Sequence, residues 1–199
     1  MDQMNLSAWI NRSEISTGGL SAMAAQSVHA VLGQSGMQAP REGDVLPALW
    51  HWFGSPPTAS MEHLGADGHP KLGGFLPPVR LNRRMWAGGA LEFMAPLHVG
   101  ERFTRETRIA NIVEKSGAAG EMVFVTLEHT ISGESGLAVR EQQDIVYLQI
   151  PDSFRAPKAI PAPQDDLREA ISVTTPLLFR YSAITFNAHR IHYDLPYAQ

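Results

Sequence analysis

The sequence predicts an α+β fold in which an antiparallel sheet wraps around one helix. Residues 19–33 carry apolar side chains at helical spacing, and four segments between residues 85 and 150 have the character of strands. A hydrophobic fraction of 44% and a charged fraction of 18% are ordinary for a globular domain. One helix followed by a run of neighbouring strands is typical of the α+β class.

The predicted helix begins after Gly19, and Gly33 stops it. Its expected buried stripe consists of Leu20, Met23, Ala24, Val28, Val31 and Leu32. Residues 45–53, VLPALWHWF, are apolar and aromatic and are interpreted as a short strand that leads into a loop. Residues 54–79 are rich in glycine and proline and should be irregular.

The four expected strands occupy residues 85–97, 102–115, 121–131 and 137–150. In the third of them an alternating pattern places one apolar set on a single face: Val123, Val125, Leu127 and Ile131. The segments HVGE, KSGAAGE and SGESG between the strands supply the glycines that tight reversals need. These strands should form an antiparallel meander.

The expected organisation is a first unit over residues 1–150, a proline-rich linker over 151–168 and the start of a second unit over 169–199. The second unit should contain a strand at 171–175 and a helix capped by Thr175, with Pro176 in its first turn. Asp194 should cap another helix. Because these elements are too few to bury a core, we expect the second unit to be truncated.

Composition excludes several functional classes. A net charge of −4 provides no general field for nucleic acid or an anionic membrane. The absence of cysteine removes disulfides, thiolate nucleophiles and cysteine-ligated zinc. The N-terminus lacks the features of a secretory signal, and no apolar run is long enough to span a membrane. We expect a cytoplasmic enzyme or binding protein.

The segment FNAHRIHYD, residues 186–194, admits three chemistries. A metal could take His189, His192 and Asp194, but a helix that begins at Asp194 leaves the histidines on a loop without a common face. A nucleophile would be Ser182 or Thr185, yet neither lies in a G-x-S-x-G turn. The third chemistry is proton transfer to carbon, for which imidazole is suited.

The stretch RYSAITFNAHRIHYDLPYA, residues 180–198, resembles the active-site segment of the MaoC-type R-specific enoyl-CoA hydratases and dehydratases. In the general motif, Asp-x-Asn-Pro-(Leu/Ile/Val)-His, His192 matches the catalytic histidine and Asn187 stands in place of the catalytic aspartate. His189 and Arg190 replace the Asn-Pro pair. These departures agree with the branch of mesaconyl-C4-CoA and itaconyl-CoA hydratases, which residues 71–93 also resemble.

This resemblance implies a double hotdog fold, of which residues 1–150 are the first unit and residues 169–199 begin the second, catalytic one. It also implies a hydro-lyase that adds water to a short, branched, dicarboxylic enoyl-CoA. His192 would then be the general base and acid. Asn187 cannot take a proton but can orient the attacking water.

Three arginines are the expected substrate-binding residues, because a guanidinium suits CoA phosphates or a distal carboxylate: Arg83, Arg84 and Arg190. For Arg83 and Arg84, which with Arg80 form the densest basic cluster, a solvated face is the other interpretation. Coenzyme A would enter as part of the substrate, and no other cofactor and no metal are expected. The expected partners are the acyl-CoA and a second copy of the chain in a homodimer.

Two other functions remain open at this point: a non-catalytic acyl-thioester binding or assembly module, and a hotdog thioesterase. The resemblance places the hydrogen-bond donors for the enolate oxygen in a part of the second unit beyond residue 199. We therefore expect these 199 residues alone to be poorly active.

Overall fold

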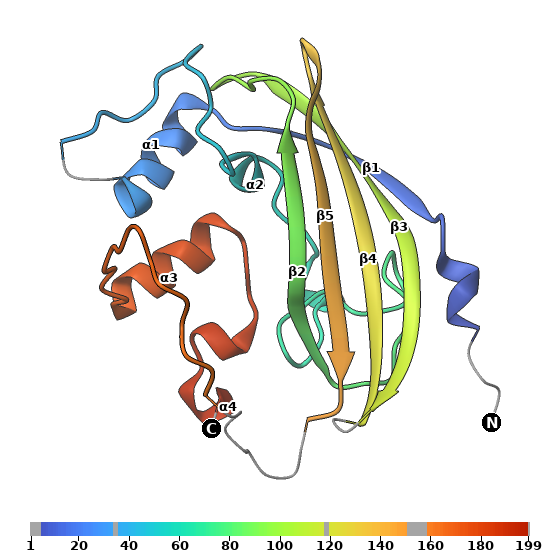
Figure 1. Ribbon diagram of the computed structural model, residues 1–199. Helices are drawn as coiled ribbons and strands as arrows, with labels where there is room; N and C mark the ends of the chain where they lie inside the picture. Colours follow the sequence, from blue (N-terminus) through green and yellow to red (C-terminus); the bar gives the residue numbers. More distant parts are fainter. Residues whose placement is uncertain (1–4, 34–35, 118–119, 151–158, 199) are drawn as a thin grey trace.

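The computed structural model describes residues 5–33, 36–117, 120–150 and 159–198. Its main feature is a five-stranded antiparallel sheet with the strand order β1-β3-β4-β5-β2 (Figure 1). The strands are β1 (Ser13–Gly19), β2 (Arg83–Phe93), β3 (Arg102–Gly117), β4 (Gly120–Gly133) and β5 (Gly136–Leu148). The last four confirm the four strands that the sequence predicted between residues 85 and 150.

One face of the sheet is buried, as the pattern of β4 predicted. Val123, Val125, Leu127 and Ile131 are each at most 7% exposed. In antiparallel pairs, residues directly opposite one another share a face, so β3 and β5 contribute the neighbouring core side chains. His129 interrupts this apolar row, because it is also buried on the same face.

The helix α1 (Ala22–Leu32) covers only one end of that face. Ser21 caps it, because its hydroxyl accepts the backbone N–H of Ala24 at 3.2 Å. Ala25 and Val28 face the core, whereas Met23 and Leu32 are exposed, so the buried stripe is rotated from the predicted one. The core is divided in two, and its second cluster lies at the other end of the sheet under residues 72–81. The helix α1 therefore covers one end of the buried face, and residues 72–81 cover the other end.

In the first 60 residues one sequence interpretation is wrong and one strand was not predicted. Residues 45–53 do not form a strand: Val45 makes a single bridge to His98, and helix α2 (His51–Gly54) follows a turn in which Trp50 N donates to Pro47 O. Pro47 prevents a continuous ladder because it has no N–H. Strand β1 gave no alternating signal because it is an exposed edge strand, held by backbone pairing to β3.

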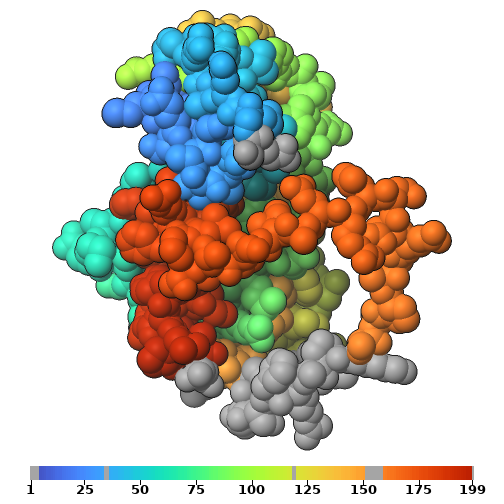
Figure 2. Space-filling model, turned by 90° about the vertical axis from the view of Figure 1, so that its left-hand side faces the viewer, coloured from blue at the N-terminus to red at the C-terminus, as the bar shows by residue number. Residues whose placement is uncertain are grey.

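The C-terminal segment lies beside the sheet, below α1 in Figure 1 and across the middle of the molecule in Figure 2. Residues 159–174 contain no helix or strand, so the predicted strand at 171–175 is wrong. Thr174, one residue before the predicted cap, accepts Leu177 N and begins α3 (Thr175–Ile184). The remaining short elements are the 3-10 helices η1 (Leu6–Trp9), η2 (Met61–His63) and η3 (Arg190–His192), and the helix α4 (Leu195–Ala198).

The predicted linker lies partly outside the described residues, since it includes 151–158. The division into a first unit, a linker and a second unit remains a prediction. Within the described part of the chain, no helix has both the length and the apolar character that crossing a bilayer requires.

Candidate active site

The motif segment 186–194 is docked on the loop of residues 65–70. The backbone N–H of Arg190 donates to Asp67 O at 2.9 Å, and its guanidinium Nη1 donates to Ala66 O at 3.1 Å. Gly68 has a φ of +85°, and a Cβ there would overlap the carbonyl oxygen of Ala188. Only glycine permits both that backbone conformation and this close approach of two loops.

Arg190 also connects the motif segment to the residues that follow it. Its Nε and Nη2 donate to Asp194 Oδ2 at 2.9 and 2.7 Å, and its guanidinium lies 4.5 Å from the ring centroid of Tyr197. The hydrogen bond from Arg190 lowers the pKa of Asp194. Asp194 also accepts Tyr197 N at the start of α4, which confirms the predicted cap. The predicted contact of Arg190 with substrate remains a prediction.

The two predicted catalytic residues lie on the same loop, one on each side of His189. The side-chain oxygen of Asn187 accepts the backbone N–H of His189 at 3.0 Å, which shapes the turn before η3. The His192 ring is exposed, and its centroid is 5.4 Å from that of His189 at an interplanar angle of 89°. Asn187 is half-buried.

The loop 65–70 adds two functional groups that sequence reasoning missed. Asp67 Oδ2 is 2.8 Å from His69 Nδ1, and Asp67 Oδ1 accepts the backbone N–H of His69 at 3.0 Å. The His69 ring packs on His189 with 3.9 Å between centroids. The only signal in the sequence was an Asp-x-His pair within GADGHP, inside a glycine- and proline-rich stretch that predicted an irregular loop.

The surroundings keep these imidazoles neutral near pH 7. Burial lowers the pKa of His69, and the nearby charge of Arg84 lowers it further. Burial and the neighbouring His69 lower the pKa of His189 to about 4. Burial opposes ionisation of Asp67, but its hydrogen bonds from His69 outweigh burial and lower the pKa of that carboxyl.

Asp67, His69 and His189 could also supply ligands to a divalent metal, because their ligand atoms lie within 4.8 Å of one another. However, His69 Nδ1 and the Asp67 carboxylate already form a hydrogen-bonded pair. That pair and the stacked rings explain the closeness of the three side chains without an ion. The prediction that no metal is needed remains untested.

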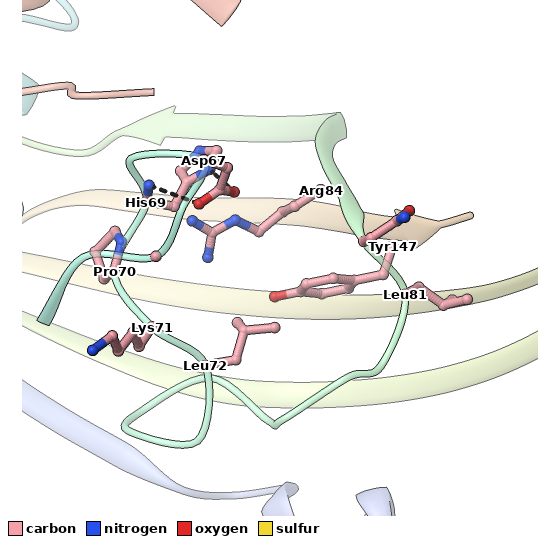
Figure 3. Close-up of a pocket in the computed structure, with 10 residues that line it drawn as sticks. Asp67, His69, Pro70, Lys71, Leu72, Leu81, Arg84 and Tyr147 are labelled. Atoms are coloured by element: carbon pink, nitrogen blue, oxygen red, sulfur yellow. Dashed lines mark hydrogen bonds and ion pairs between the residues drawn. The ribbon is translucent and has the colours of Figure 1, made fainter. Parts of the chain in front are cut away.

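A cavity of about 430 Å³ opens beside the Asp67–His69 pair. Arg84 on β2 and Tyr147 on β5 are register partners and line it, together with Lys71. Figure 3 shows the Arg84 guanidinium pointing toward Asp67 and His69, with the Tyr147 ring beside it. The Tyr147 hydroxyl is buried and has no hydrogen-bond partner among the residues that the structure describes.

The structure separates the two neighbouring arginines predicted to bind substrate. Arg84 is half-buried and faces the cavity, whereas Arg83 is exposed and does not line it. The reason is the alternation of a strand, in which successive side chains point to opposite faces. Of the two, Arg84 alone is brought to the site.

A second buried polar cluster lies between the two halves of the core and was not predicted. His129 pairs with Glu141 across β4 and β5, and its Nδ1 is 2.9 Å from Thr107 Oγ1. Glu141 Oε2 accepts Trp52 Nε1 at 3.0 Å. Burial and the charge of Arg105 lower the pKa of His129 to about 4.

Comparison with known proteins gives concordant results. Residues 49–199 match the family described as hydroxyacyl-thioester dehydratase type 2. The chain is 41% identical over 201 residues to the mesaconyl-C(4)-CoA hydratase of Chloroflexus aurantiacus, covering 100% of this chain and 71% of that protein. It is 28% identical over 165 residues to the mitochondrial hydroxyacyl-thioester dehydratase type 2 of Schizosaccharomyces pombe, covering 68% of this chain and 53% of that protein.

Solved structures show the same fold. A MaoC-like dehydratase superimposes with a TM-score of 0.63 at 11% identity, over 97% of this chain and 71% of that one. The MaoC-like dehydratase from Phytophthora capsici gives a TM-score of 0.60 at 14% identity, over 94% and 66% of the two chains. These likenesses confirm the predicted α+β hotdog fold.

Proposed function

Because the chain belongs to the hydroxyacyl-thioester dehydratase type 2 family, which consists of hydro-lyases, we propose that it hydrates an enoyl-CoA. The proposed acyl group is short, branched and dicarboxylic. The mesaconyl-C4-CoA and itaconyl-CoA types are the candidates. The observation that carries the proposal is the docking of the motif 186–194 on the loop 65–70, whose Asp67 and His69 line a cavity that also contains the half-buried Arg84.

The reaction needs a group that exchanges protons with water and with carbon. In the proposed mechanism, an imidazole removes a proton from water as the oxygen bonds to Cβ, and a proton is then given to Cα. His192 is proposed for these transfers because its exposed ring is open to a bound substrate. Asn187 would hold the water through its amide nitrogen, since its oxygen accepts the backbone N–H of His189.

The cavity suits a distal carboxylate on the acyl group. Arg84 provides a fixed cation with several N–H donors, and the Tyr147 hydroxyl provides a further donor that is buried without a partner in the described residues. Burying a hydroxyl without a partner costs free energy unless a ligand satisfies it. A carboxylate placed between these two groups would satisfy both, and this supports the choice of a dicarboxylic substrate.

The proposal is tested by assaying the full-length protein with three thioesters: mesaconyl-C4-CoA, itaconyl-CoA and crotonyl-CoA. Crotonyl-CoA lacks the distal carboxylate. Loss of the enoyl absorbance and a product heavier by one water define hydration. We expect a higher kcat/KM for a dicarboxylic substrate than for crotonyl-CoA. Release of free CoA thiol would instead indicate a thioesterase, and binding of all three without reaction would indicate a binding module.

Arg84→Gln tests the carboxylate site. A hydrogen bond to a charged group contributes about 1.5–3 kcal/mol, so the preference for the dicarboxylic substrate should fall about 10- to 100-fold. Arg140→Gln is the matched control, because Arg140 is an exposed arginine on β5 that does not line the cavity. An unchanged preference in Arg84→Gln would show that the carboxylate binds elsewhere. We propose an acyl-CoA and a second copy of the chain as the partners.

A further inference from the structure

In the motif that residues 187–192 resemble, an aspartate occupies the position of Asn187, and the amide of Asn187 cannot take a proton. We propose that the Asp67–His69 pair, supplied by the loop 65–70, is the second acid–base group of this site and replaces the missing carboxylate. This inference rests on the proposed hydratase function and divides its proton transfers between two histidines.

The geometry of the pair is that of an oriented base. Asp67 holds the ring of His69 through Nδ1 at 2.8 Å and its backbone N–H at 3.0 Å. With the Nδ1 proton donated to the carboxylate, Nε2 carries the lone pair that can accept a proton. The carboxylate also stabilises the imidazolium that forms when His69 accepts that proton.

The pair is held against the motif by several contacts that do not depend on a ligand. The Arg190 backbone N–H binds Asp67 O, and Gly68 allows the two loops to touch. The rings of His69, His189 and His192 follow one another with centroid separations of 3.9 and 5.4 Å. His69, the proposed base, and His192, the predicted acid, thus lie on either side of His189.

The charges around His69 are suited to a base that is neutral at rest. Burial and Arg84 lower the pKa of His69, while Asp67 opposes them. His189 is kept neutral by its own lowered pKa and serves as a spacer between the two working rings. Arg84 faces the same pair and lines the cavity in which the acyl group is proposed to bind.

The proton balance closes without any further reactant. His69 Nε2 takes a proton from water as the water oxygen bonds to Cβ, and the double-bond electrons move to Cα and the thioester carbonyl. Protonated His192 then gives its proton to Cα. Transfer of a proton from His69 to His192 through solvent restores the starting state, and dehydration runs the same steps in reverse.

His69→Gln, Asp67→Asn and His192→Ala are compared in the protein as its gene encodes it. His63→Gln serves as the control, because His63 is an exposed histidine nearby that lies outside the cavity. We expect His69→Gln to lower kcat by about 10²–10⁴ with little change in KM, the usual contribution of a positioned base. Thermal unfolding of each variant checks that the fold is kept.

The pH profile separates a base from a structural residue. Because Asp67 raises the pKa of His69 and Arg84 lowers it, Asp67→Asn should move the acid limb of kcat/KM to lower pH. Arg84→Gln should move the same limb to higher pH. A residue that only supports the loop would change the rate without these opposite displacements.

The outcomes are distinct. A wild-type rate that survives His69→Gln but is lost in His192→Ala would overturn this inference alone. So would one equivalent of bound zinc that disappears in Asp67→Asn, because Asp67 and His69 would then be metal ligands. A wild-type protein that hydrates none of the three thioesters would overturn the proposed function, and the inference with it.

Discussion

Replacing Gly68 by alanine should separate the loop 65–70 from the catalytic motif. The new Cβ would overlap the carbonyl oxygen of Ala188, and backbone on both sides leaves no flexible side chain that could move away. The loop must therefore shift. That shift breaks the hydrogen bond from Arg190 N to Asp67 O at 2.9 Å and the one from Arg190 Nη1 to Ala66 O at 3.1 Å.

Gly43→Ala is the matched control. Gly43 has a φ of +82°, close to the +85° of Gly68, but a Cβ there would meet nothing within 4 Å. In both variants the free energy of unfolding should fall by about 1–2 kcal/mol, because an L-residue is placed in the left-handed region. Only Gly68→Ala also loses two hydrogen bonds, which contribute about 1 kcal/mol each to stability. The accompanying shift of the loop affects the rate as well, since a displacement of about 1 Å at a reacting group lowers it roughly 10²-fold.

We therefore expect kcat to fall about 10²-fold in Gly68→Ala and to stay near the wild-type value in Gly43→Ala. Hydrogen exchange provides a second measurement, since the Arg190 amide should lose protection in Gly68→Ala alone. The assay uses the protein as its gene encodes it and the best substrate of the three thioesters. Equal rates and equal Arg190 protection in the two variants would mean that the docked loop is not part of the active site.

If His192 transfers a proton, His192→Ala should lower kcat by about 10²–10⁴, and near wild-type turnover of this variant would contradict the assignment. Asn187→Ala should lower kcat less than His192→Ala does. Asn187→Asp should keep substantial activity and change the pH profile of the reaction. The free energy of unfolding, measured with urea, should decrease as pH falls from 6.5 to about 4, because buried His129 has a pKa of about 4 in the folded state and the unfolded chain binds the proton first. The full lowering of the His129 pKa on folding corresponds to a decrease in the free energy of unfolding on the order of 3 kcal/mol. A free energy of unfolding that does not change between these pH values would show that His129 is not shielded from protonation. Dialysis against a chelator should leave the hydration rate unchanged, and a loss restored by zinc would show that Asp67, His69 and His189 hold a metal.

Those features of the chain that depend on neighbouring residues could be predicted from its sequence. Strand-like segments separated by glycine-containing turns located four of the five strands, with clear apolar alternation in β4. Asp194 was recognised as a helix cap because capping involves neighbours in the chain. The motif FNAHRIHYD pointed to the family without any coordinates. Edge strand β1 escaped notice because both of its faces are exposed, so burial imposes no period on its side chains.

Which groups lie next to the motif 186–194 could not be predicted, because it depends on contacts between distant parts of the chain. Asp67 and His69 are more than a hundred positions away from His189, and their loop carries no periodic signal. Their contact depends on Gly68, whose lack of a Cβ lets two irregular backbones touch. Likewise Arg84 faces the cavity and Arg83 does not, because the register of β2 against β5 sets which side of the strand is inward. Contacts between distant loops follow from the packing of the whole chain, and local sequence patterns do not encode them.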